Sequence, residues 1–414
     1  MSVKSEAMND VNAKPEPMND IKREKQSDER INVEKWVYGG DAMARIEGRV
    51  VFVPFVLPGE IVKVRLKDGD MHAELAEITQ PAPERVVPPC PLFTHCGGCH
   101  YQHAPYEFQV ARKVDILREQ LRRVGKIKWE GEIETISGPA LGYRNRGQFH
   151  LANGKIGYLA PGTHDLVPVD GECPISSPRL NQALQEMRDR MTDRRFPNFV
   201  HSLELFTDET KVQVNILETD RPVAKSFYEW CQSTVALEYS TTFGKFRVSP
   251  RSFFQVNRFL VDQLVEAAIG DAAGETALDL YAGVGLFAIP LARKFKKVAA
   301  VEAGITAARD LEVNAQNAGQ VIQHLQGRVE DHLARMTATP DFIVADPPRA
   351  GLGKTVVSHL ARLKPPKLTI VSCDPATLAR DVAGLTDYKI DSLTLVDLFP
   401  QTYHLETVAR LSLR

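Results

Sequence analysis

The apolar and polar positions along this 414-residue chain change their pattern several times. Residues 1–30 are polar, rich in Lys, Glu and Asp, and contain no aromatic residue. Such a segment cannot bury enough apolar surface to offset the entropy lost on ordering, so we predict a disordered tail. Residues 31–82 instead carry short β-type runs, at 50–53 and 60–66, joined by a Leu-Pro-Gly-Glu turn at 57–60. This pattern predicts a small β-barrel.

The middle of the chain mixes helix and strand patterns. Five prolines between residues 81 and 91 indicate a linker. Residues 105–125 have an apolar side at helical spacing and end in a glycine, which predicts one amphipathic helix that could pack on the C-terminal domain. From 133 to 250 the predicted strands are short and separated by polar turns. We therefore assign residues 83–250 to a central α+β domain.

The last third of the chain has a different order of elements. After Phe259, helical and β-type segments alternate, which is typical of a parallel sheet covered by helices. We expect residues 251–414 to form a Rossmann-like domain. The predicted fold class is α/β, with a small OB-like barrel at its N-terminal end and the central α+β domain between the two.

Composition narrows the class of protein. The chain has 43% hydrophobic and 25% charged residues, no apolar run long enough to cross a bilayer, and no apolar core of a signal peptide. We expect a cytoplasmic, monomeric protein whose six cysteines are reduced, metal-bound or catalytic. The net charge of −2 does not indicate a nucleic-acid binder, although binding depends on local patches.

Four cysteines have the spacing of a metal site. Cys90, Cys96 and Cys99 lie close together, and Cys173 lies far along the chain before a proline. Three ligands from one loop and a fourth from a distant segment favour a [4Fe–4S] cluster. Structural zinc, which more often uses two closely spaced pairs, is the second interpretation, and free thiols or a disulfide are the third. Cys231 has no such neighbours and is expected in the core.

Basic and aromatic residues near these cysteines suggest contact with RNA. Phosphates could be neutralised by Arg144, Arg146, Lys155 and Arg179, and bases could stack on Tyr143, Phe149 and Tyr158. A solvated basic face is an equally good interpretation.

A strand, a glycine turn and a helix at 276–288 have the pattern of a site for an adenosine-containing cofactor. Glu302 ends the next strand, where it could bind ribose hydroxyls, and Asp346 ends a third strand before two prolines. The glycines also satisfy the dinucleotide pattern, so NAD is an alternative. An acid at Asp279, before the turn, instead favours S-adenosylmethionine, whose amino group is cationic.

Cys373 follows a predicted buried strand and precedes a helix. Ligands of open α/β sheets bind at this edge, and a helix N-terminus there would favour the thiolate. Glu406 follows another apolar run and could supply a carboxylate base at the same edge. A small buried thiol without chemistry is the alternative interpretation.

Together these motifs resemble the S-adenosylmethionine-dependent RNA 5-methyluridine methyltransferases. The resemblance runs from about residue 31 to the end of the chain. The motifs that carry it are Ser-Phe-Phe-Gln-Val-Asn at 252–257, Asp-Leu-Tyr-Ala-Gly-Val-Gly at 279–285, Asp-Pro-Pro-Arg at 346–349, Ser-Cys-Asp-Pro at 372–375 and Leu-Glu-Thr-Val at 405–408. The barrel sequence at 39–45 and 53–60 resembles a TRAM domain, which binds RNA. A TRAM barrel together with a cysteine cluster is similar to the branch that modifies 23S ribosomal RNA.

The resemblance implies roles for individual residues. Cys373 would be the nucleophile and Glu406 the general base, and S-adenosylmethionine would contact Gln255, Tyr281, Glu302 and Asp346. The substrate would be an unpaired loop or a partly unfolded RNA segment, since the target base must leave its stack. A tRNA uridine is the nearest alternative substrate. An iron–sulfur, NAD-dependent oxidoreductase and a non-catalytic RNA-binding protein are the alternatives from other classes.

Overall fold

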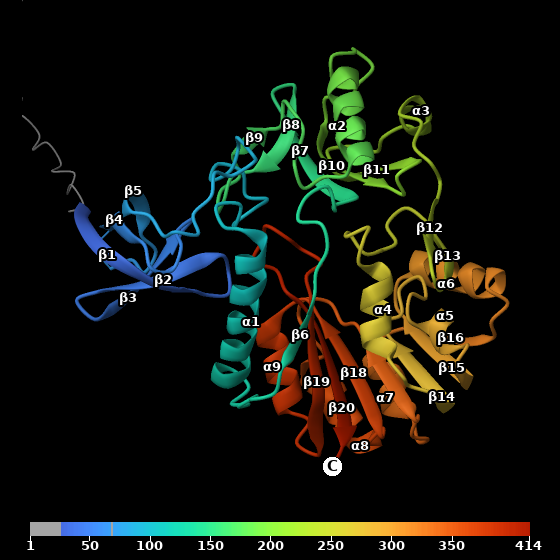
Figure 1. Ribbon diagram of the computed structural model, residues 1–414. Coiled ribbons are helices and arrows are strands. Elements are labelled where there is room, and N and C mark those ends of the chain that lie inside the picture. Colours follow the sequence, from blue (N-terminus) through green and yellow to red (C-terminus); the bar gives the residue numbers. More distant parts are fainter. Residues whose placement is uncertain (1–25, 68) are drawn as a thin grey trace, which may run out of the picture.

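The computed structural model describes residues 26–67 and 69–414. In Figure 1 the barrel lies beside helix α1, and the central domain lies above the catalytic domain. The disordered tail predicted over residues 1–30 falls on undescribed residues up to position 25. Residues 26–30 already belong to the first barrel strand, so the barrel begins earlier than predicted.

The barrel consists of five antiparallel strands in the order β3-β2-β1-β4-β5. These are β1 (Gln26–Trp36), β2 (Asp41–Ile46), β3 (Arg49–Pro54), β4 (Ile61–Lys67) and β5 (Glu74–Gln80). Strand β1 pairs with β4 over its first half and with β2 over its second, with an irregularity at Val33. After the turn at 57–60, the buried Glu60 accepts hydrogen bonds from Leu57 N (2.8 Å) and Arg85 Nε (2.5 Å). This ion pair fixes the turn to the linker that follows the barrel.

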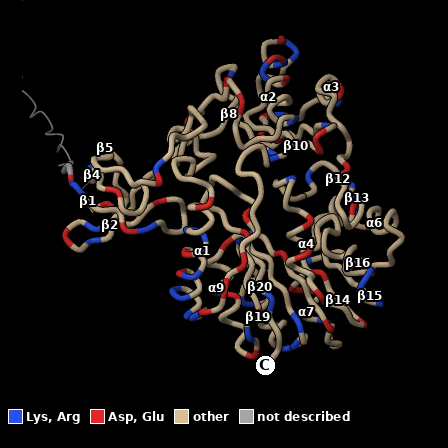
Figure 2. The backbone as a smooth tube through the Cα atoms, in the orientation of Figure 1, with Lys and Arg blue, Asp and Glu red and all other residues tan. Residues whose placement is uncertain are grey.

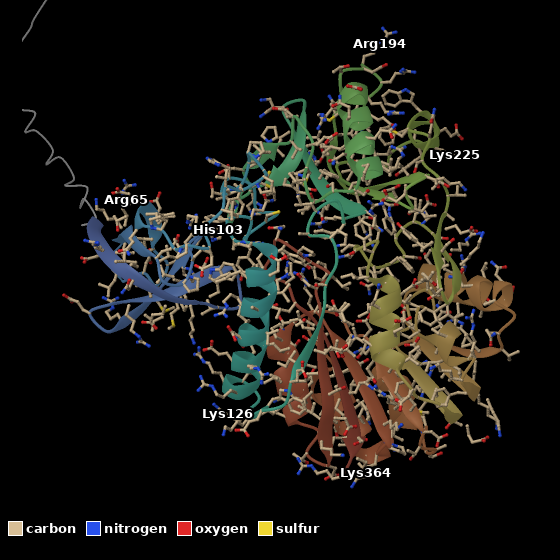
Figure 3. The ribbon with its side chains drawn as sticks, in the orientation of Figure 1. Arg65, His103, Lys126, Arg194, Lys225 and Lys364 are labelled. Atoms are coloured by element: carbon tan, nitrogen blue, oxygen red, sulfur yellow. The ribbon has the colours of Figure 1, made fainter. Side chains whose placement is uncertain are left out.

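The barrel is packed firmly against the rest of the protein. The rings of Trp36 and Tyr101 stack at 3.9 Å, and Lys35 pairs with Glu119 at 2.6 Å. His103, labelled in Figure 3 at this junction, is buried between Trp36 and Phe93. The apolar core of the barrel is continuous with that of the catalytic domain.

The central domain is a second antiparallel sheet, in the order β11-β10-β7-β8-β9. Its strands are β7 (Arg146–Ala152), β8 (Lys155–Leu159), β9 (Leu166–Pro168), β10 (Val200–Thr207) and β11 (Val212–Thr219). Helix α2 (Pro178–Met191) packs on it, and α3 (Lys225–Trp230) follows. The hairpin β12 (Leu237–Thr241) and β13 (Gly244–Val248) leads into the catalytic domain.

The catalytic domain has an eight-stranded sheet in the order β16-β15-β14-β17-β18-β20-β19-β6. The strands are β14 (Gly274–Leu280), β15 (Phe295–Glu302), β16 (Ile322–Gln326), β17 (Phe342–Ala345), β18 (Lys367–Ser372), β19 (Tyr388–Val396), β20 (Glu406–Leu413) and β6 (Ile133–Ile136). Strands β14 to β18 are parallel, and β20 runs antiparallel between β18 and β19. This arrangement confirms the predicted α/β fold class.

Helices cover both faces of this sheet. They are α1 (Tyr106–Arg123), α4 (Val261–Ile269), α5 (Ala288–Leu291), α6 (Ile305–Asn317), α7 (Val329–Arg335), α8 (Gly353–Leu363) and α9 (Pro375–Ala383). Successive residues of β17 enter different cores: Ile343 packs with α1, α7, α8 and α9, and Val344 packs with α4, α5 and α6. Both faces are therefore apolar, as expected for strands covered on both sides.

The structure differs from the predicted domain boundaries in residues 105–137. Helix α1 packs against α9, which agrees with the predicted packing of the 105–125 helix. Strand β6 then pairs with β19 at the far edge of the catalytic sheet, with Ile133 opposite Leu393. Buried Lys113 on α1 forms an ion pair with Asp397 at 2.7 Å. This segment therefore belongs to the catalytic domain. Sequence patterns did not show this, because its partners lie more than 200 residues further along the chain.

The distribution of charge and hydropathy does not indicate where the functional site lies. Figure 2 shows Lys and Arg interspersed with Asp and Glu in all three domains, in keeping with the small net charge. In the part of the chain that the structure describes, no helix has the length and apolar character needed to cross a membrane.

Candidate active site

The carboxyl ends of β17 and β18 and the start of β20 meet at one edge of the sheet. Ser372, the last residue of β18, pairs with Thr407 of β20, so Cys373 and Glu406 are neighbours across the two strands. Asp346 directly follows β17, whose last residue pairs with β18. The structure thus brings together three of the residues proposed from sequence. Glu406 is buried and Cys373 is half-buried.

The protonation of these groups is set by burial and by their mutual repulsion. Burial raises the pKa of Cys373 to about 12, with Glu406 and Asp346 adding to the shift and Arg349 opposing it. The pKa of Glu406 is raised well above its usual value by burial and by Asp346. Burial raises the pKa of Asp346 to about 7. Burial and mutual repulsion therefore favour the protonated forms of these groups, and Arg349 opposes this effect at Cys373.

This result corrects the expectation that a helix N-terminus favours the thiolate. The N-cap of α9 is Asp374, not Cys373, and its Oδ1 accepts hydrogen bonds from Ala376 N (3.0 Å) and Thr377 N (2.8 Å). The helix dipole is thus opposed by a carboxylate that lies next to the thiol. The positive charge of Arg349 instead lowers the pKa of Cys373. Arg349 belongs to the Asp-Pro-Pro-Arg motif, so the sequence already pointed to this residue.

The glycine turn after β14 has the backbone conformation that a close-fitting ligand requires. Tyr281 has φ +64°, and Gly283 and Gly285 have φ +54° and +96°. Glu302 at the end of β15 accepts from Gly283 N (2.8 Å) and Gly304 N (2.6 Å). Glu302 therefore lies beside the glycine turn, where its carboxylate could also meet a bound ligand.

Asp279 makes this pocket suitable for a cation. It is fully buried, and neither carboxylate oxygen has a well-formed hydrogen bond to another described residue. Its pKa is raised well above the usual value by burial and by repulsion from Asp346 and Glu302, while the nearby backbone N–H of Ala288 opposes the shift. Three carboxyl groups that repel one another, with no ion pair to a basic side chain among the described residues, suit a ligand with positive charge, such as the sulfonium and amino groups of S-adenosylmethionine. They would repel the pyrophosphate of NAD.

The other two cofactor candidates are placed less directly. Tyr281 is half-buried, and its pKa is raised to about 12 by burial, Glu330 and Asp381. Gln255 is buried in the segment that joins the central and catalytic domains, where the next residue, Val256, accepts a backbone hydrogen bond from Asn145 (3.0 Å). A role for either as a cofactor ligand stays a prediction.

The four clustered cysteines line one cavity of about 190 Å³. Gly98 N donates to Cys96 Sγ at 3.4 Å, and the Asn181 amide holds the backbone of Cys173 on both sides (2.9 and 3.1 Å). All are free thiols, and Cys231 is buried in the central core, as predicted. Within residues 26–67 and 69–414, no three His, Cys, Asp or Glu side chains are positioned to hold a single metal ion. The sequence therefore located the four thiols correctly, while a metal between them stays a proposal.

A hollow of about 970 Å³ opens where the three domains meet. Its lining includes Gly40 and His72 of the barrel, Arg144 and Tyr158 of the central domain, and Arg349, Tyr403 and His404 of the catalytic domain. Arg349 lines this hollow and also lowers the pKa of Cys373, and His404 lies two residues before Glu406. The hollow therefore lies close to the candidate site.

Several residues proposed for RNA contact are not available to RNA. Tyr143 and Phe149 are fully buried and cannot stack on a base. Arg146 pairs with Glu204 at 2.5 Å, and Arg179 pairs with Glu186 at 3.3 Å. In β7 the side chains alternate between faces, and Phe149 lies on the face that packs in the central core. The prediction was wrong for Tyr143 and Phe149 because sequence alone did not show which face was covered. Arg144 and Tyr158 line the hollow and Lys155 is exposed, so a role for these three stays a prediction.

Comparisons with known proteins agree with this architecture. A family model described as tRNA (Uracil-5-)-methyltransferase matches residues 228–413, and a TRAM domain model matches residues 22–71. An uncharacterized RNA methyltransferase of Aquifex aeolicus is 33% identical over 93% of this chain and 98% of its own length. The chain belongs to the RNA uracil-5-methyltransferase family. The 23S rRNA (uracil(1939)-C(5))-methyltransferase RlmD of Pseudomonas putida is 31% identical to this methyltransferase, over 92% of this chain and 93% of that one.

A solved structure shows the same fold. The tRNA (uracil-54, C5)-methyltransferase of Pyrococcus abyssi, in complex with S-adenosyl-L-homocysteine, matches with a TM-score of 0.72 and 24% identity. The match covers 92% of this chain and 100% of that one. Family membership confirms the predicted activity, S-adenosylmethionine-dependent methylation of uracil C5 in RNA, and the TRAM domain. It also removes the NAD-dependent oxidoreductase from the alternatives.

Proposed function

We propose that this methyltransferase modifies C5 of a uridine in 23S ribosomal RNA through a covalent adduct between Cys373 and C6. The observation that carries the mechanism is the register of β18 and β20: Ser372 pairs with Thr407, so Cys373 and Glu406 are neighbours, near the buried carboxyl groups of Asp346 and Asp279. A thiol and a carboxyl group on neighbouring residues can act on adjacent carbons of one pyrimidine ring.

The chemistry follows from the weak nucleophilicity of C5. The thiol of Cys373 releases its proton to solvent, its sulfur then forms a bond to C6, and the electron pair of the C5–C6 double bond moves toward the C4 carbonyl, giving an enolate. Arg349 favours the thiolate that this step consumes. When bound, S-adenosylmethionine supplies the methyl group to C5. Glu406, as a carboxylate, then takes the C5 proton, and the released electron pair restores the double bond as the S–C6 bond breaks.

The residues around the glycine turn fit the methyl donor. Asp279 and Asp346 would face its positive groups, Glu302 would meet its ribose, and Gln255 and Tyr281 would complete the pocket. The support is the buried, unpaired carboxylate of Asp279 together with the raised pKa of Asp346, since a nearby cation would stabilise both as carboxylates.

RNA is expected to enter through the hollow between the three domains. Its lining combines a TRAM barrel, Arg144, Arg349 and the rings of Tyr158 and Tyr403, which suit phosphates and unstacked bases. The target base must leave its stack to reach Cys373, so a loop or a partly unfolded segment is the expected substrate. The named 23S rRNA enzyme at 31% identity supports ribosomal RNA over tRNA.

The choice of RNA can be tested in cells. Mapping of 5-methyluridine in ribosomal and transfer RNA from a deletion strain should show one 23S position that loses its methyl group. Re-expression of the intact gene should restore the modification. Loss confined to tRNA would assign the alternative substrate, and unchanged modification in both RNAs would contradict the proposal.

The cysteine cavity is proposed to hold a [4Fe–4S] cluster through Cys90, Cys96, Cys99 and Cys173. The four thiols surround a space far larger than the roughly 10–15 Å³ that one water occupies, which leaves room for several atoms. Tightly grouped ligands would be expected for a single zinc ion. Bound to these residues, a cluster would tie the 90–99 loop to residue 173. Iron and sulfide analysis of anaerobically purified protein should find about four of each per chain, whereas stoichiometric zinc would contradict the assignment.

A further inference from the structure

A tyrosine of the barrel reaches the loop that carries Cys373. Tyr38 lies in the turn between β1 and β2 and donates a hydrogen bond from its hydroxyl to Asp374 Oδ2 at 2.9 Å. The two residues are 336 positions apart in the chain. Since the other oxygen of Asp374 caps α9, this carboxylate is held by the barrel on one side and by the helix on the other.

The same turn contacts the loop that precedes Glu406. The ring of Tyr38 packs edge-on against that of Tyr403, with centroids 5.6 Å apart and an interplanar angle of 84°. At Gly40, where φ is +104°, a Cβ atom would come within 2.7 Å of the His100 ring and 3.2 Å of Tyr403. The backbone of the barrel turn is therefore fitted closely into this site.

The segment that follows Cys99 contacts this site from the other side. His100 N and Tyr101 N both donate to Gln401 O, at 2.8 and 3.0 Å. The rings of His100 and Tyr403 lie 4.7 Å apart. The turn of the barrel is thus enclosed between the loop of Cys373, the loop before Glu406 and the segment after Cys99.

We infer that Tyr38 is a positioning residue for the methyl transfer: it orients the Cys373 loop by holding Asp374, so the barrel completes the active site in addition to contacting RNA. This inference rests on the proposed role of Cys373 as the nucleophile. Asp374 is next to Cys373 in the chain and ends the short loop between β18 and α9, which is held mainly by local bonds, such as Ser372 Oγ to Asp374 O (3.0 Å). The Tyr38 bond is the long-range restraint on that loop. Loss of a hydrogen bond to a charged group should let the loop take other orientations.

The test is the variant Tyr38→Phe, which keeps the ring on Tyr403 and removes only the hydroxyl. We expect kcat to fall about tenfold while KM for RNA and the Kd for S-adenosylmethionine stay within twofold. The rate at which 5-fluorouridine RNA traps Cys373 should fall by the same factor. Alkylation of Cys373 by iodoacetamide in the RNA-free enzyme, followed by peptide mass spectrometry, measures the reactivity of the thiol without any contribution from RNA.

A matched control is Tyr388→Phe. Tyr388 donates a hydrogen bond of similar length, 2.8 Å, to Pro365 O at the opposite end of the sheet. This variant should keep wild-type kcat. It would thereby show that loss of a tyrosine hydroxyl does not lower kcat through a general effect on stability. In a double-mutant cycle, Tyr38→Phe should have little further effect in Asp374→Asn protein, since both changes act on one bond.

The outcomes separate this inference from the proposed function. Wild-type kcat and trapping in Tyr38→Phe would overturn it, as would weaker RNA binding at unchanged kcat, which would leave Tyr38 with a role in RNA contact alone. Additive effects in the double-mutant cycle would also contradict it. If wild-type enzyme itself forms no adduct while methylating RNA, the proposed mechanism fails instead.

Discussion

Cys373 and the four cysteines that line the cavity are all partly exposed, but they have different neighbours. Burial raises the pKa of Cys373 to about 12 and that of Cys99 to about 12, so neither is marked out by its thiol alone. Cys99 is influenced next by Cys173, whereas Cys373 is influenced next by Glu406. Thiols that surround a cavity suit a metal cluster, and a single thiol beside a carboxyl group suits bond formation with carbon. The neighbouring groups, not the burial, assign the chemistry.

The largest expected effect separates Cys373 from every other thiol. Cys373→Ala should lower the methylation rate by at least about 1000-fold, because the variant lacks the sulfur that adds to C6 in the proposed mechanism. Binding of S-adenosylmethionine should remain within twofold, measured by calorimetry. The control is Cys231→Ala in the core of the central domain, which should keep near-normal turnover. Comparable turnover in both variants would remove the distinction.

The second prediction concerns Glu406. Glu406→Gln cannot take the C5 proton, so turnover should fall by roughly 100- to 10,000-fold. The adduct with ordinary uridine RNA should then accumulate as a slowly migrating band on denaturing gels. Cys373→Ala is the control that should form no adduct. A fall in turnover of Glu406→Gln without an adduct would place Glu406 before the methyl transfer, contrary to the mechanism.

The cluster cysteines should behave differently. Cys173→Ser removes the ligand that connects the distant segment, so iron content should fall below about half of the wild-type amount. The affinity for S-adenosylmethionine should stay within about twofold, because that pocket lies in another domain. Equal iron content in the variant, measured by colorimetric assay, would show that Cys173 is not a ligand.

The smallest expected effect comes from pH. The pKa of Asp346, raised to about 7 by burial, means that the carboxyl group is neutral in more acidic solution and loses its attraction for a cation. The affinity for S-adenosylmethionine should therefore increase about threefold or more between pH 5.5 and 7.5. Asp346→Asn should flatten this dependence. A stronger affinity at pH 5.5 than at pH 7.5 would show that Asp346 does not face the cofactor.

The parts of the site that sequence could predict lie at strand ends. Cys373, Asp346 and Glu302 each follow a run of apolar residues, and the carboxyl ends of parallel strands meet at one edge of a sheet. The fold class followed from the same alternation of strands and helices. Short-range patterns therefore located these residues, whereas their chemical roles followed from the family resemblance.

Contacts between distant segments could not be predicted in this way. Nothing in the pattern around Tyr38 indicates a bond to Asp374, and nothing around Ile133 indicates a strand beside β19. Both depend on how three domains are packed. The same limit explains why Tyr143 was expected at the surface although it is buried, with its hydroxyl bonded to Pro400 O at 2.9 Å.

The covalent step is tested most directly by trapping with RNA that carries 5-fluorouridine at the target position. Fluorine in place of the C5 proton prevents the final elimination, so the account predicts a stable complex of protein and RNA that survives denaturation. Mass spectrometry should locate the RNA on the peptide containing Cys373 and show one added methyl group. Methylation of ordinary RNA without such a complex, or a complex at another residue, would contradict the role of Cys373 as the nucleophile.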